Sequence, residues 1–246
     1  MDALKFTLSG KTAFFKKPDV NTYYYFTYGN IHKVALLGML GAIRGYKGYN
    51  QQEAEGTTYP EFYEKLKDIK VGIVPKNENG YIPKKVQVFN NSVGYASKEM
   101  GGNLIVKEQW LESPKWDIYI LIQGEAEKEL VDRILNFRTS YIPYLGKNNH
   151  IADIKEVELI RNIEKVSNVS KIYSLFIKHN FKPLVVEDEF DDEYIFPYKY
   201  EEMLPIGLEE TTNKYNLETF IYTNSKLECI KDSLVYDCNG NIIFFF

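Results

Sequence analysis

The order of the predicted elements in the first 137 residues is the strongest constraint on the fold. Alternating apolar and polar side chains predict strands at 4–8, 85–89, 104–110 and 116–122. An apolar segment between Asn30, a suitable N-cap, and Gly45 predicts a helix over 31–44. A second, amphipathic helix is predicted over 126–137. Strand, helix, strand, strand, helix is most of a split βαβ or ferredoxin-like unit, so we expect an α+β fold.

The connector between the second and third of these strands has few large apolar side chains. Residues 90–103 contain Asn90, Asn91 and three glycines instead. Such a segment cannot bury enough surface to pack as a core of its own. We therefore predict a protruding β-hairpin over about 88–106, whose lone aromatic residue, Tyr95, is available to a partner or a nucleic acid.

Two further segments lie between the predicted strands. Gly38 and Gly41 fall inside the helix predicted over 31–44, where each costs roughly 1 kcal/mol relative to alanine. That cost is reasonable if another element approaches the helix backbone closely. Residues 51–80 look like an insertion that contains a short helix over 60–70.

The C-terminal part is predicted to be smaller and β-rich. Its pattern suggests a strand over 154–159, a helix over 169–179 and a closing hairpin over 235–246 around Asn239-Gly240. We accordingly divide the chain into a ferredoxin-like domain, residues 1–150, and an acidic C-terminal subdomain, residues 151–246.

Charge is distributed unevenly along the chain. The net charge is −4, yet residues 1–184 carry 26 basic and 20 acidic side chains, whereas residues 185–246 carry 4 and 14. An anion-binding surface is therefore expected in the N-terminal part, and the acidic part is expected to face solvent or another protein. All but four of the basic residues are lysines. Because lysine meets phosphate as a point charge, this favours contacts to a nucleic-acid backbone over the reading of base edges.

Several classes of enzyme lack their signatures here. The chain has no P-loop, dinucleotide-binding glycine pattern, zinc-type cluster or GxSxG elbow. We expect no cofactor, no metal and no catalytic residues, and a structural or surface role for His32, His150 and His179. Two cysteines cannot form a disulfide framework, which favours a reducing, cytoplasmic compartment. The longest nearly apolar stretch, 34–43, is about half the length of a membrane-spanning helix, so no membrane is expected.

Two clusters leave alternatives open. The acidic run over 187–193 offers carboxylates to a divalent metal, but its spacing matches no EF-hand loop, so a solvated loop or a protein-facing patch is favoured. The aromatic stretch over 23–28 is suited to stacking unpaired bases, and it is equally suited to packing at the margin of a sheet.

Short motifs along most of the chain match a known family. They are residues 10–18 (GKTAFFKKP), 36–43 (LLGMLGAI), 109–111 (QWL) with Pro114, 143–146 (PYLG), and 236–246 with Gly240. By these motifs the chain resembles the CRISPR-associated "fifth" subunit family, the RAMP-superfamily component of type I Cascade complexes, and is similar to subtype I-B. The loop over 51–80 and the acidic C-terminal region match nothing in this family.

The resemblance implies a ferredoxin-like, RNA-recognition-type domain with a hairpin thumb. It implies a non-catalytic subunit that binds and caps the 5′ handle of crRNA in antiviral defence, in a ribonucleoprotein complex where base pairing reads the target. The implied partners are the Cascade backbone subunit, the large subunit and target DNA near the PAM-proximal end. The candidate RNA-binding residues are Lys11, Lys16, Lys17, Tyr24, Tyr25, Tyr28, His32, Lys33, Arg44, Tyr95, Lys107, Gln109 and Trp110.

Two alternatives to this function remain. One branch of the family cuts precursor RNA with a tyrosine and a lysine–histidine pair, so the chain could be a metal-independent endoribonuclease. Tyr46 is a possible tyrosine, but no histidine is adjacent at Lys115-Trp116. The other alternative is a structural adaptor without RNA contact, whose basic N-terminal part a protein partner would neutralise.

Overall fold

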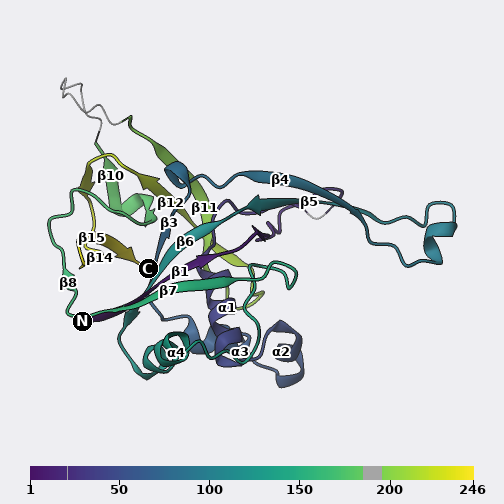
Figure 1. Ribbon diagram of the computed structural model, residues 1–246, viewed down its shortest axis with the longest axis horizontal. Coiled ribbons are helices and arrows are strands. Elements are labelled where there is room, and N and C mark those ends of the chain that lie inside the picture. The colour runs from purple at the N-terminus through teal and green to yellow at the C-terminus, as the bar shows by residue number, and fades with distance from the viewer. Residues whose placement is uncertain (21, 185–195) are drawn as a thin grey trace.

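A four-stranded antiparallel sheet forms the centre of the computed structural model, which describes residues 1–246 except 21 and 185–195, and not the side chains of 53–55. The strand order is β3 (Val71–Pro75), β6 (Lys115–Ile122), β1 (Asp2–Ser9) and β7 (Asp153–Ile160). Figure 1 shows the helices gathered on one side of this sheet. They are α1 (Lys33–Arg44), α2 (Tyr49–Glu55), α3 (Glu61–Leu66) and α4 (Glu125–Leu135). The α+β expectation is confirmed at this level.

Alternation along β1 explains how the sheet is covered on both faces. Leu4, Phe6 and Leu8 are fully buried in the main apolar core, which includes α1 and α4. Ala3 belongs to a second buried cluster on the opposite face, together with Tyr119 of β6 and strands of the C-terminal region. Since side chains along a strand alternate between faces, one strand serves both cores.

The described strands after β7 pair antiparallel with one another. β11 (Lys199–Leu208) pairs with β12 (Tyr215–Thr223), which pairs with β9 (Phe176–Ile177). β15 (Asn241–Phe245) pairs with β14 (Leu234–Cys238), which pairs with β8 (Glu164–Lys165). β10 (Phe181–Pro183) pairs with β13 (Leu227–Cys229). The closing hairpin is confirmed, and the division of the chain at residue 150 stays a prediction.

The last residue is tied to α1 and to the central sheet. Lys33 is buried, and its Nζ donates to a main-chain oxygen of Phe246 at 3.0 Å. The backbones of Phe246 and Val71 exchange hydrogen bonds of 3.1 and 3.2 Å. Burial, with a smaller contribution from nearby Lys70, lowers the pKa of Lys33 to about 8.

The segment between β3 and β6 forms a long arm. β4 (Lys84–Asn90) pairs antiparallel with β5 (Ile105–Glu112) from Lys84–Leu111 to Asn90–Ile105. Figure 1 shows this β4–β5 arm extending away from the sheets, with the 3-10 turn η2 (Ala96–Lys98) at its tip. A shorter strand, β2 (Thr12–Ala13), pairs with β5 where the arm begins. Two further 3-10 turns are η1 (Glu78–Gly80) and η3 (Lys178–Asn180).

Three predictions of local structure are wrong. Residues 169–179 form no helix: Val169, Ile172 and Leu175 are buried, but the backbone bonds to other segments, such as Leu175 N–H to Ile73 O at 2.8 Å. The α1 cap is His32, whose Nδ1 accepts from Ala35 N–H at 3.2 Å, because Asn30 instead accepts from the Trp116 indole. The region read as an insertion contains β3, a sheet strand hidden in sequence by its shortness.

The two glycines of α1, Gly38 and Gly41, differ in how closely Phe62 approaches them. A Cβ built on Gly41 would lie 2.5 Å from the Phe62 Cβ, whereas one on Gly38 would meet only the Phe62 Cε2, at 3.8 Å. We expect Gly41→Ala to reduce the free energy of unfolding by about 1 to 3 kcal/mol through overpacking. Gly38→Ala should raise it by up to about 1 kcal/mol through helix propensity. Urea denaturation of both variants checks this, and equal effects would contradict the close approach at Gly41.

Candidate nucleic-acid interface

The loop over 16–28 is held against the base of the β4–β5 arm by backbone hydrogen bonds. Tyr25 N–H donates to Lys107 O, and Gln109 N–H donates to Tyr25 O, both at 2.9 Å. Within the loop, Lys17 N–H donates to Phe26 O at 2.8 Å. The sequence placed these residues far apart, and the structure brings Tyr25, Lys107 and Gln109 into one short ladder.

Aromatic and basic side chains meet on this loop. Lys16 Nζ lies 4.2 Å from the centre of the Tyr25 ring, a cation–π geometry. The Tyr24 and Phe26 rings pack with their centres 4.7 Å apart. Tyr24 and Tyr25 are half-buried. The rings therefore pack together, as one of the two readings expects, and still reach the surface, while the stacking of bases on them stays a prediction.

The positive charge of Lys17 is offset by a carboxylate from the acidic C-terminal region. Its Nζ lies 3.1 Å from Glu202 of β11, and the Glu202 carboxylate also accepts from Gly29 N–H and from the Tyr200 hydroxyl. Glu202 keeps only 12% of its side chain exposed. This corrects the expectation that the acidic part faces only solvent or another protein. Burial, with the nearby Glu202 charge, also raises the pKa of Tyr200.

Two side chains of β5, Glu108 and Trp110, take part in a largely buried polar cluster. The Glu108 carboxylate accepts from Trp110 Nε1 at 2.8 Å and pairs with Lys147. The Trp110 and His150 rings meet edge to face with centres 4.6 Å apart, and His150 Nδ1 lies 2.6 Å from Thr12 Oγ1. Burial lowers the pKa of His150. Trp110 is thus fixed by its neighbours, and Lys147 is the charged group of this cluster with the most exposure.

A glycine lets the loop that carries Lys147 approach the N-terminal segment. Gly146 has φ +90°, and a Cβ on it would lie 1.8 Å from the Phe14 carbonyl oxygen. Leu145 O accepts from Phe14 N–H at 3.1 Å across the same contact. Lys147 Nζ then lies 4.9 Å from the centre of the Phe14 ring. Any larger residue at 146 would displace this loop.

The other candidate residues are scattered. Tyr28, His32 and Lys33 are buried, so they have little surface for a direct contact and instead support the loop and α1. Arg44 pairs with Glu129 and donates to the Tyr46 hydroxyl. Lys11 is exposed after β1, and Tyr95, 80% exposed, lies at the far tip of the arm. The RNA-binding role of the exposed residues stays a prediction.

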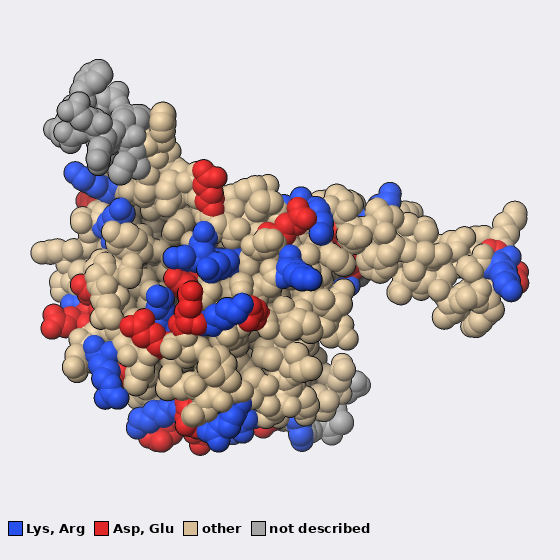
Figure 2. All heavy atoms as spheres, viewed as in Figure 1, with Lys and Arg blue, Asp and Glu red and all other residues tan. Residues whose placement is uncertain are grey.

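Sequence reasoning missed Lys147, Lys47 and Tyr144, which lie near the loop over 16–28 and α1. They and Lys16 line one cavity. A signal existed for Tyr144, which lies in the motif over 143–146, and Lys147 directly follows that motif. Figure 2 shows lysines and arginines interspersed with acidic residues over the body, while most of the arm is uncharged on this face.

The described residues contain no group of three or more histidine, cysteine or acidic side chains placed to hold a metal ion. The acidic run over 187–193 lies outside the described residues. Within the described part of the chain, no helix is long and apolar enough to cross a membrane.

Comparison with solved structures identifies proteins of similar fold. A crystal structure of a CRISPR protein from Archaeoglobus fulgidus superimposes with a TM-score of 0.54 at 11% identity, over 99% of this chain and 98% of that one. The chain shares the fold of a CRISPR protein. A chain of a CRISPR RNA-guided surveillance complex gives a TM-score of 0.50 at 12% identity, over 93% and 91% of the two chains. No protein-family model matches the sequence, and no curated protein matches it.

Buried His32 makes stability depend on pH. Burial lowers its pKa to about 3, so the unfolded chain binds a proton below about pH 6.5 that the folded chain does not. The contribution of neutral His32 to the free energy of unfolding is present above pH 6.5. It is lost as the pH decreases, by about 2 kcal/mol between pH 6.5 and 5 for one such histidine. His32→Asn keeps a capping side chain and removes this titration.

We therefore expect the free energy of unfolding of His32→Asn, measured by urea denaturation, to fall by about 2 kcal/mol less than that of the unmodified protein between pH 6.5 and 5. His179→Asn is the matched control, because the same substitution is made at a histidine whose side chain is half exposed. Parallel pH dependences for all three proteins would show that His32 is protonated in the folded state.

Proposed function

We propose that this protein is a non-catalytic subunit of a type I CRISPR effector complex and holds the 5′ handle of crRNA. The observation that carries the proposal is the similarity of fold, along 99% of the chain, to a CRISPR protein. The motifs of the "fifth" subunit family favour the same assignment, including the subtype I-B-like branch. The order β1, α1, β3, β6, α4, β7 supports a ferredoxin-like reading of the central sheet.

The RNA surface is proposed to be the loop over 16–28 together with the base of the β4–β5 arm. Lys16 over Tyr25 offers a charge beside an aromatic face, and Lys107 is exposed on β5 next to it. Single-stranded RNA is held by this combination of positive charge and stacking platforms. The arm would act as a thumb toward the backbone subunit, with the large subunit and PAM-proximal target DNA as further partners.

The salt dependence of RNA binding tests the proposal. The affinity for a guide RNA with its 5′ handle is measured by fluorescence anisotropy at several salt concentrations. We expect Lys16→Ala to reduce the slope of log affinity against log salt by about 0.7, one phosphate contact on a single strand. Lys17→Ala should change it less, because Glu202 already offsets the Lys17 charge. Lys128→Ala on α4 is a control, since Lys128 pairs with Glu125 on α4. If all slopes are equal, the loop over 16–28 contacts no phosphate.

The arm is expected to be separable from the fold. The large apolar residues near its tip are exposed, namely Val93, Tyr95 and Met100. Replacing residues 92–101 by Asn-Gly should therefore shorten the hairpin and leave the melting temperature unchanged. Assembly with the other subunits on guide RNA should weaken, because the arm supplies contacts that the body cannot. Assembly at unchanged affinity, with the same guide nucleotides protected, would mean that the arm is no thumb.

Absence of cleavage is the third part of the proposal. The Tyr46 hydroxyl accepts from Arg44 Nε and Nη2 at 3.3 and 3.2 Å, which gives this tyrosine a structural partner. We expect precursor crRNA to stay intact when incubated with the protein in EDTA, as followed on a denaturing gel. A specific cut that disappears in Tyr46→Phe would establish the endoribonuclease instead.

A further inference from the structure

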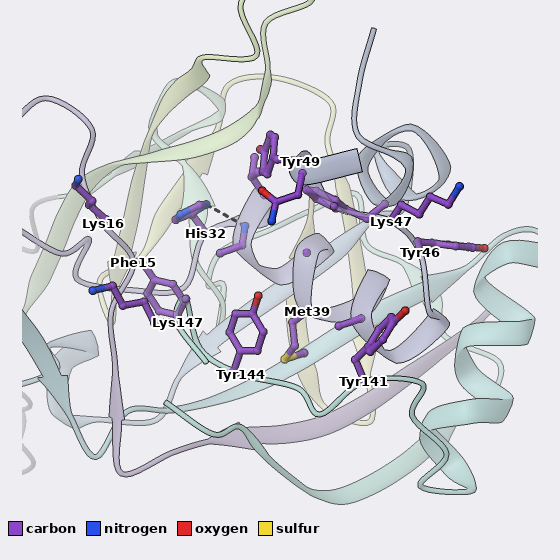
Figure 3. A pocket seen from close by; sticks show the side chains of 18 of the residues that line it. Phe15, Lys16, His32, Met39, Tyr46, Lys47, Tyr49, Tyr141, Tyr144 and Lys147 are labelled. Carbon is purple, nitrogen blue, oxygen red and sulfur yellow. Dashed lines mark hydrogen bonds between the residues drawn. The ribbon is translucent and has the colours of Figure 1, made fainter. Parts of the chain in front are cut away.

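A cavity of about 600 Å³ lies beside α1 and is lined by residues from several separate segments of the chain (Figure 3). One face of α1 provides its apolar floor, formed by Val34, Ala35, Gly38, Met39 and Ala42. The spacing of these residues keeps them on the same side of the helix. A volume of this size is typical of sites for small molecules or single nucleotides.

Gly38 leaves room at the floor of the cavity. A Cβ at this position would have only the Phe62 Cε2 within 4 Å, at 3.8 Å. Gly41, one turn further along α1, is instead covered by Phe62. Gly41 therefore allows Phe62 to pack against the helix, whereas Gly38 widens the cavity.

Aromatic rings form the walls. Tyr49 packs edge-on against Phe62, with ring centres 5.7 Å apart, and keeps 47% of its surface exposed. Tyr144 and Tyr141 lie across from Tyr49 in Figure 3 and are 43% and 61% exposed. Flat rings that border an open apolar space are suited to another flat ring.

The charged groups among the described residues that line the cavity are all basic. Lys16 and Lys147 lie at one end of it and Lys47 at the other (Figure 3). No aspartate or glutamate is among the described residues that line it. Lys147 pairs with buried Glu108, which offsets part of its charge as Glu202 offsets that of Lys17, and Lys16 lies over Tyr25 at the same end of the cavity. The charge complements an anion attached to the flat ligand.

We propose that this α1 cavity accepts one unstacked nucleotide of the bound RNA, with its base between the tyrosines and its phosphate toward Lys16 and Lys147. The proposal rests on the proposed function, which brings single-stranded RNA to the neighbouring loop over 16–28. It adds that one base leaves the strand and enters the body of the protein. That nucleotide would therefore contribute more to affinity than its neighbours.

The test combines abasic RNA with a variant that fills the cavity. Each nucleotide of the handle is replaced in turn by an abasic one, which keeps the phosphate and removes the base, and affinity is measured by fluorescence anisotropy. We expect one position to lose about tenfold or more, as for a base stacked on aromatic side chains. Gly38→Leu should bind the intact handle about tenfold more weakly and lose sensitivity to that abasic position.

Ala126→Leu is the matched control, because Ala126 lies on α4 and does not line the cavity. It should keep both the affinity and the abasic profile. Tyr144→Ala provides a second variant in case Gly38→Leu does not fold, and it should reduce the same abasic effect by removing one wall.

The possible outcomes distinguish the two proposals. A flat abasic profile, or a profile that Gly38→Leu and Tyr144→Ala leave unchanged, overturns the cavity site while RNA binding by the loop over 16–28 stands. Absence of handle binding by the unmodified protein overturns both the cavity site and the proposed function.

Discussion

The central sheet must be covered on both faces, and the positions of the other elements follow from this requirement. β1 directs Leu4, Phe6 and Leu8 toward the helices, and Ala3 toward a second apolar cluster that includes strands of the C-terminal region. An antiparallel sheet can leave one face in water, but β6 buries consecutive side chains and therefore both of its faces, so this sheet needs elements packed on each side. The helices therefore occupy one face, and the chain must return with its last strands to cover the other. The bonds between Phe246 and Val71 complete that return.

The predictable elements are those with a local reason for their structure. β1, α1, α4 and the closing hairpin each combine periodicity with a turn or cap signal, and the structure contains all four. β3 was missed because a five-residue strand with Gly72 and Pro75 has almost no period to recognise. The segment 169–179 has apolar residues at helical spacing, yet its backbone is satisfied by distant strands. Long-range pairing of this kind leaves no local signal.

In the candidate site, too, features with a local sequence signal were predictable and those set by distant contacts were not. The basic and aromatic character of residues 16–28 is visible in sequence, whereas their attachment to β5 through Tyr25 is a tertiary fact. Burial of Tyr28, His32 and Lys33 could not be deduced from residue type, because each has a polar group that suits a surface. The partner of Lys17, Glu202, comes from the acidic half of the chain. A charge count by segment therefore overstates the positive charge that a ligand meets.

The attachment of Tyr25 to β5 gives the β4–β5 arm the properties of a lever. The seven residues of β4 span about 23 Å at the usual rise per residue. A rotation of about ten degrees at the base would move the far end of β4 by about 4 Å on that strand length. The Lys107–Tyr25–Gln109 ladder joins the same base to the loop that carries Lys16. A displacement of the arm at its base would therefore also move the backbone of Tyr25, in the loop that carries Lys16.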